Sequence, residues 1–168
     1  MPLTKIPLTK ADIEAVKSKK KNKSKFRIWI SIVSFLILLI VYLSVGFDTS
    51  NSTFEFFKIV VIVIHAFLLL GSLTDTNFYN DLNEKQKYVG LVKVKKKEYF
   101  FDSEDNSESH IIIFDDWRIG EKSFKKEHWN KINKGDEFYV EQAANSGLVF
   151  KLEKENIDFK TGLLFFKQ

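Results

Sequence analysis

The chain contains no cysteine, which excludes disulfide bridges, thiolate nucleophiles and cysteine-based zinc sites. Its seven glycines are scattered, so no glycine-rich loop is available to cradle a phosphate group. A dinucleotide-binding motif, a P-loop and a G-x-S-x-G nucleophile elbow are also missing. The sequence therefore lacks the commonest signatures of catalysis.

Histidine is scarce as well, with His65, His110 and His128 as the complete set. None has a second histidine at helical spacing, as a catalytic zinc site would require. The acidic stretch 102–108 lacks the turn glycine of a calcium loop. We therefore expect a non-enzymatic protein with no catalytic residue, no cofactor and no metal site.

Two long apolar runs dominate what is present. Residues 28–47 contain no charged side chain, and residues 54–73 contain titratable groups only at Glu55, Lys58 and His65. A helix rises about 1.5 Å per residue, so each run matches the roughly 30 Å of a bilayer's hydrocarbon core. The short loop 48–53 would make the two helices antiparallel neighbours. The pattern predicts a two-helix transmembrane hairpin over residues 28–74.

Charge is unevenly distributed along the chain. Residues 1–27 hold nine basic and two acidic side chains, whereas residues 28–168 hold 17 and 20. Lysine and arginine gather on the cytoplasmic side of membrane segments, so we expect both termini in the cytoplasm. The heavy use of Lys, Ile, Phe and Asn indicates an AT-rich bacterial genome. The expected location is the bacterial inner membrane, with a multi-pass topology.

The basic tail, residues 1–27, has two readings. It is a topology signal, or it also binds the anionic headgroups of the lipid bilayer. The side chains expected to contact headgroups are Lys19, Lys20, Lys21, Lys23, Lys25 and Arg27. Within the tail, Thr9 and Asp12 have the spacing of a capping box, which predicts the start of a short helix.

One polar contact is predicted inside the membrane. His65 falls near the middle of the second run, at about the depth of Ser34 in the first. A hydrogen bond between polar side chains stabilises a pair of membrane helices by roughly 0.6–2 kcal/mol. A proton relay would need further ionisable partners at that depth, which the two runs lack. We therefore interpret the pair as a structural contact.

Residues 75–168 have the pattern of a small β domain. Strands are predicted at 88–94, with 98–101 as an extension or a separate strand, and at 110–114 and 117–123. A hairpin is predicted from 137–142 and 148–153. Phe124, His128 and Ile132 recur at helical spacing, which predicts a short helix ending by Gly135.

A small antiparallel sheet must close or be covered to hide its edges. The predicted fold is therefore membrane α + β: the hairpin of helices 28–47 and 54–73, then a small antiparallel β-barrel of the SH3-like or OB-like type with one short helix. Such a small domain needs large aromatic side chains in its core. We expect these to be Trp117, Phe124, Trp129 and Tyr139.

A run of lysines precedes three aromatic residues in the first predicted strand. The lysines are Lys93, Lys95, Lys96 and Lys97, followed by Tyr99, Phe100 and Phe101. We interpret the run as an edge strand blunted by lysines, with a patch for a ligand or for lipid as the other reading. Residues 75–168 hold 16 basic and 18 acidic side chains, which argues against a nucleic-acid partner.

Two short patterns carry a resemblance to a known family. Gly90-x-Val92 and Ile132-x-x-Gly135-Asp136-x-x-x-Val140 resemble the NfeD-like bacterial membrane proteins, which join a transmembrane hairpin to a cytoplasmic small β-barrel. The resemblance implies an assembly or scaffolding module. We expect such a module to interact with a homo- or hetero-oligomeric protein partner within a membrane complex, and we expect no small-molecule ligand.

The plan also resembles the two-helix membrane effectors of anti-phage signalling systems. In those proteins a cytoplasmic β-barrel senses a cyclic nucleotide. This alternative implies a ligand-gated effector, in which the lysine run would bind a small anionic ligand.

Overall fold

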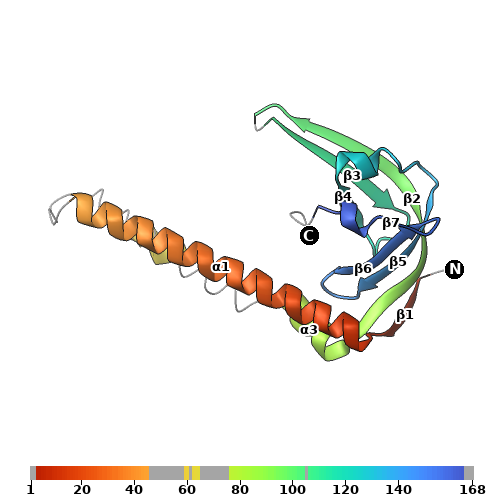
Figure 1. Cartoon of the computed structure of the whole chain (residues 1–168), viewed down its shortest axis with the longest axis horizontal. Helices are drawn as coiled ribbons and strands as arrows, with labels where there is room; N and C mark the ends of the chain where they lie inside the picture. The colour runs from red at the N-terminus through yellow and green to blue at the C-terminus, as the bar shows by residue number, and fades with distance from the viewer. Residues whose placement is uncertain (1–2, 46–58, 61, 65–75, 105, 165–168) are drawn as a thin grey trace. The chain divides into compact units, whose positions relative to one another are not determined.

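The computed structural model describes residues 3–45, 59–60, 62–64, 76–104 and 106–164 (Figure 1). The chain divides into two compact units, Met1–Ala15 with Asn80–Gln168, and Val16–Tyr79. The elements are β1 (Thr4–Pro7), α1 (Lys10–Val45), α3 (Thr76–Glu84), β2 (Gln86–Asp102), β3 (Ser107–Phe114), β4 (Glu121–Phe124), α4 (Lys126–Trp129), β5 (Glu137–Ala143), β6 (Val149–Lys154), β7 (Ile157–Asp158) and the 3-10 turn η1 (Lys160–Gly162).

The predicted capping box is confirmed at the start of α1. The backbone N–H and the hydroxyl of Thr9 both donate to the Asp12 carboxylate, at 2.9 and 2.8 Å, and the Asp12 N–H donates to the Thr9 hydroxyl at 3.2 Å. The helix that follows is longer than predicted: it has 36 residues and continues through the basic run. Lysine is a strong helix former, and the run contains no proline or glycine to end the helix.

The predicted transmembrane hairpin is not supported. Within the described ranges, no helix is long and apolar enough to cross a bilayer. This finding overturns the transmembrane helices 28–47 and 54–73, the multi-pass topology and the bacterial inner-membrane location with both termini in the cytoplasm. One helix instead joins the charged tail to the first apolar run. The loop 48–53 and most of the second run lie outside the described residues.

Over the described residues, seven strands form an antiparallel sheet in the order β4-β3-β2-β5-β6-β7, with β1 paired to β2. The long strand β2 organises this sheet. Its first half pairs with β5 from Lys87 to Lys93, and its second half pairs with β3 from Val94 to Asp102. The N-terminal strand β1 pairs with the start of β2, which sequence reasoning missed.

The sheet is open, which corrects the predicted closed SH3-like or OB-like barrel. The strand order ends at β4 and β7, which have four and two residues and are too short to close a barrel. The C-terminal segment covers the edge of β4 instead, through a bridge between Phe124 and Leu163. Two backbone hydrogen bonds support it, Lys125 N–H to Gly162 O at 2.7 Å and Leu164 N–H to Ser123 O at 2.8 Å.

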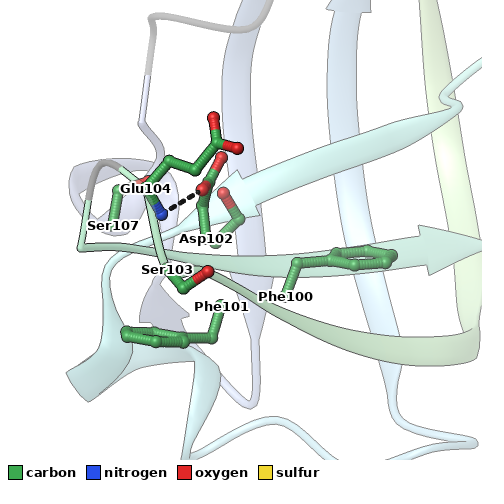
Figure 2. Close-up of a pocket in the computed structure, with 7 residues that line it drawn as sticks. Phe100, Phe101, Asp102, Ser103, Glu104 and Ser107 are labelled. Carbon is green, nitrogen blue, oxygen red and sulfur yellow. Dashed lines mark hydrogen bonds between the residues drawn. The ribbon is translucent and has the colours of Figure 1, made fainter.

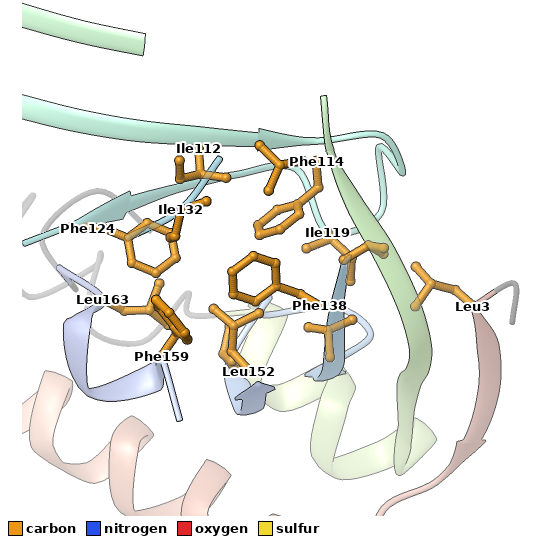
Figure 3. Packing of buried hydrophobic residues seen from close by; sticks show 14 residues of the cluster. Leu3, Ile112, Phe114, Ile119, Phe124, Ile132, Phe138, Leu152, Phe159 and Leu163 are labelled. Carbon is orange, nitrogen blue, oxygen red and sulfur yellow. The ribbon is translucent and has the colours of Figure 1, made fainter. Parts of the chain in front are cut away.

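The core of the sheet unit is built on aromatic edge-to-face contacts (Figure 3). Phe138 is fully buried and its ring lies 5.7 Å from that of Phe114 and 5.2 Å from that of Phe159. Phe124 is also fully buried, as predicted. Trp117 contradicts the predicted core, because its side chain is 86% exposed in the turn before β4.

The predicted helix over Phe124, His128 and Ile132 is wrong in extent. Phe124 ends β4, and α4 has only the four residues Lys126–Trp129. Its last residue, Trp129, packs against the core while remaining half-buried. The hairpin of β5 and β6 and the buried strand His110–Phe114 are confirmed.

Candidate functional site: a projecting aromatic hairpin

The outer parts of β2 and β3 form a two-stranded ribbon that projects beyond the other strands (Figure 1). We name this ribbon, Lys96–Ile113, the hairpin arm; its pairs run from Lys96 opposite Ile113 to Asp102 opposite Ser107. The neighbouring strand β4 reaches only His110–Ile113, and β5 pairs with β2 only up to Lys93. Among the described residues, no third strand therefore supports the outer half of the arm.

A β-bulge sets the two faces of the arm. The register shifts between Val94 and Lys96, which leaves Lys95 as an extra residue in β2. Side chains alternate along a strand, so Tyr99 and Phe101 share the inner face, toward the core, and Phe100 takes the outer face. The extra residue thus decides which aromatic side chains face the core side.

The base of the arm is anchored on its inner face. The ring of His110 lies between those of Tyr99 and Trp129, at 5.3 and 5.2 Å. The Trp129 indole donates to the Ile111 carbonyl at 3.2 Å. The ammonium group of Lys97 lies 3.9 Å from the Trp129 ring centroid and donates to the Trp129 carbonyl at 2.9 Å. Burial in this contact lowers the pKa of Lys97.

The outer half of the arm exposes three successive aromatic side chains. Tyr99, Phe100 and Phe101 are 49%, 55% and 54% exposed. Figure 2 shows Phe100 and Phe101 pointing apart, as alternation along a strand requires. An open hollow of about 550 Å³ lies at the tip, and it is lined by Phe100, Phe101, Asp102, Ser103, Glu104, Ser107 and Ser109. The Glu104 N–H donates to the Asp102 carboxylate there at 2.9 Å.

Charge changes sign along the arm. Lysines occupy its base, whereas Asp102 and Glu104 occupy its tip, and Glu108 on β3 forms an ion pair with Lys126 at 3.0 Å. The hydrogen bond from Lys126 lowers the pKa of Glu108. The arm therefore combines an apolar centre with a basic base and an acidic tip.

The predicted lysine patch is spread over different partners. Lys93 pairs with Glu137 at 3.1 Å and Lys96 with Glu98 at 2.6 Å. Lys97 turns toward Trp129, as described above, and Lys95 lies in the bulge. These contacts do not bring the four ammonium groups to one ligand.

The basic side chains of the tail lie along α1. They are Lys19, Lys20, Lys21, Lys23, Lys25 and Arg27. Lys20 lies over the ring of Tyr79 at 5.5 Å and Lys23 over that of Phe78 at 5.4 Å. Their contact with lipid headgroups stays a prediction.

The predicted contact between Ser34 and His65 is not tested. The Ser34 hydroxyl donates to the Ser31 carbonyl at 3.1 Å. His65 lies outside the described residues.

The arm was missed at the level of sequence, although its signal was present. Tyr99, Phe100 and Phe101 are consecutive, so one strand must place aromatic side chains on both faces. A strand buried on one face does not need that arrangement. Within the parts of the chain that the structure describes, no group of three or more histidine, aspartate or glutamate side chains is arranged to hold a metal.

No family model, no curated protein and no solved structure matches this chain. The resemblance to the NfeD-like proteins is therefore not tested by comparison and stays a prediction.

Proposed function

We propose that the sheet unit is a non-enzymatic protein-interaction module and that the hairpin arm is its binding surface. The observation that carries this proposal is the exposure of Tyr99, Phe100 and Phe101 on a ribbon whose outer half has no third strand among the described residues. Aromatic side chains are enriched at the centres of protein interfaces, where they are buried on binding. Burying one exposed phenylalanine contributes about 1.5–3 kcal/mol.

The backbone of the arm supports the same conclusion. A two-stranded hairpin is marginally stable in water, and a third strand is what usually stabilises it. Free strand edges pair with other chains through backbone hydrogen bonds. The outer half of β2 offers such an edge beside its aromatic side chains. A partner strand would satisfy the backbone and bury the apolar surface together.

The titratable groups around the arm have partners typical of a structural role and not of a catalytic one. Lys126 forms an ion pair with Glu108, and Lys96 forms one with Glu98. His110 is buried between two aromatic rings. None of these groups faces the hollow at the tip, whose lining is aromatic, hydroxyl and acidic.

The test is the size of the native assembly in cells that carry the gene. A tagged full-length chain is extracted without denaturant and sized, and Phe100→Ser with Phe101→Ser is compared with the wild type. We expect the wild type to migrate in an assembly of defined stoichiometry. In the double variant, the amount of chain in that assembly should fall at least tenfold.

Trp117→Ser and Leu91→Ser are the matched controls, because both side chains are exposed and apolar but lie outside the arm. They should leave the assembly unchanged. Equal loss in the controls, or no loss in the arm variant, would overturn the proposal.

A further inference from the structure

We infer that the partner of the arm is a second copy of this chain, paired antiparallel along the free edge of β2. This inference rests on the proposed function and names the partner. The two arms would form a continuous four-stranded sheet about a two-fold axis. Three features of the arm favour a second copy: its unprotected edge, its order of charges and its single compatible register.

Among the described residues, the outer edge of β2 is protected only at its base. Natural edge strands avoid pairing with other chains through lysines, prolines and bulges. Here the bulge and the lysines all occur at residues 95–97. The segment from Tyr99 to Phe101 has no charge, no proline and no bulge, and it is exposed. The protected base confines pairing to the outer half of the arm.

The order of charges favours a copy of the same segment as the partner. From residue 95 onward, three lysines come first, Glu98 and the aromatic residues follow, and Asp102 at the end of β2 and Glu104 in the turn come last. An antiparallel copy therefore brings the acidic end of one arm to the basic end of the other, at two symmetric places. Opposite charges on facing strands stabilise pairing, and like charges oppose it. A parallel copy would align like charges.

The register follows from face and charge together. A two-fold axis perpendicular to the sheet places residues of the same face opposite each other, so the pairing shifts only in steps of two residues. Moving the axis along β2 by one residue produces one such step. With Tyr99 on the axis, Lys96 lies opposite Asp102 of the second copy. Moving the axis to Glu98 places that carboxylate opposite its own copy, and moving it to Phe100 places Glu98 opposite Asp102. Only the Tyr99 register avoids directly opposed like charges.

The first experiment is a charge exchange with purified full-length chain, measured by sedimentation equilibrium. Lys96→Glu and Asp102→Lys should each weaken the dimer by at least tenfold in dissociation constant, since each places like charges together at two symmetric positions. An equimolar mixture of the two variants should recover dimer, because a pairing of unlike variants restores opposite charges at both places. Association through any other part of the chain is the same in every variant.

Lys125→Glu is the control for the change of net charge, because this lysine is exposed and lies at the junction of β4 and α4, and strand β3 separates β4 from β2. It should leave the dissociation constant unchanged. Weakening of the same size in this control, or failure of the mixture to recover dimer, would overturn the inference.

The second experiment uses the absence of cysteine. Tyr99→Cys places the single thiol of each chain on the two-fold axis, where directly opposite Cβ atoms lie about 4.5–5.5 Å apart. Two-electron oxidation by added copper-phenanthroline and oxygen removes two protons from the two thiols and forms one S–S bond. We expect a crosslinked dimer from Tyr99→Cys and none from the exposed control Trp117→Cys at equal protein concentration.

The failures of the two proposals can be told apart. A full-length chain that stays monomeric in isolation, while its cellular assembly still depends on Phe100 and Phe101, would overturn the second copy as partner and leave the interaction module intact. If changes in the arm reduce neither the cellular assembly nor the dimer of the purified chain, both the interaction module and the second copy as partner are overturned.

Discussion

Lys122 shows how a single residue can depart from its sequence pattern. It stands in β4 between Glu121 and Ser123, in a stretch that looks solvated, yet its side chain is only 6% exposed. Its neighbour on β3 is the fully buried Ile112. Burial lowers the pKa of Lys122 to about 8, against a smaller opposing effect of Glu121. Sequence could not reveal this burial, because it depends on which face of β4 meets the core.

The stability of the protein should report this buried lysine. The folded-state pKa lies below the unfolded value of 10.5, so between about pH 8 and pH 10.5 the unfolded chain binds the proton more strongly. Stability should therefore rise with pH across that window, by on the order of 3 kcal/mol from Lys122 alone. Lys122→Met should remove this rise and raise the urea midpoint at pH 7. The exposed Lys131→Met should do neither; a wild type and Lys122→Met with equal pH dependence would contradict the assignment.

Among the elements, the presence of a strand was easier to predict than the residue at which an element ends or the neighbour that covers its edge. The alternation and the Asn-Ser-Gly turn made the β5–β6 hairpin predictable, and the apolar run made β3 predictable. The helix near His128 was overextended, because apolar spacing alone cannot tell a helix from a strand followed by one helical turn. Its real boundary depends on η1, which lies far away in the chain and covers the edge of β4.

The contact between η1 and α4 can be tested at Gly162. A Cβ at this position would lie 2.2 Å from Cγ and 2.5 Å from Cδ2 of His128. Gly162→Ala should therefore displace the imidazole, whose ring lies 5.9 Å from that of Phe159, and lower the free energy of unfolding by about 1–3 kcal/mol. In a His128→Ala background the two closest atoms are gone but Cβ, at 2.7 Å, remains, so the cost should fall without disappearing. Urea unfolding of the four proteins measures both numbers, and an equal cost in both backgrounds would show that the clash is not responsible.

At the scale of the whole sheet unit, a buried ionic triad joins the N-terminal segment to the sheet. Lys87 on β2 is 4% exposed and contacts Asp12 at 2.8 Å and the Glu141 carboxylate. Burial lowers the pKa of Lys87, but the hydrogen bonds with both carboxylates outweigh it and hold the pKa above 10.5. For Asp12, burial raises the pKa and the hydrogen bonds from Lys87 and Thr9 outweigh it, holding the value below 3.8.

These shifts give the pH window of the triad. The Asp12 contribution is present above about pH 4 and is lost as the pH falls through its lowered folded-state pKa. The Lys87 contribution is present below about pH 10.5 and is lost as the pH rises through its raised pKa. Lys87→Met leaves the buried Asp12 carboxylate and the half-buried Glu141 carboxylate without a cation and should cost about 3–5 kcal/mol at pH 7.

Lys93→Met provides the comparison for that variant in thermal and urea unfolding. Its ion pair with Glu137 has side chains 60% and 53% exposed, so the cost should stay within about 1 kcal/mol. Equal losses in the two variants would show that the buried triad adds nothing beyond a surface pair.

The sequence by itself determined what depends on near neighbours in the chain. It predicted the capping box at Thr9, the buried strand ending at Phe114 and the hairpin of β5 and β6, because a few adjacent residues control each of them. Only the tertiary structure decided that the sheet stays open, that Lys122 is buried and that the outer edge of β2 has no neighbour among the described residues. Burial and edge pairing are properties of residues far apart in the chain, so no local pattern carries them.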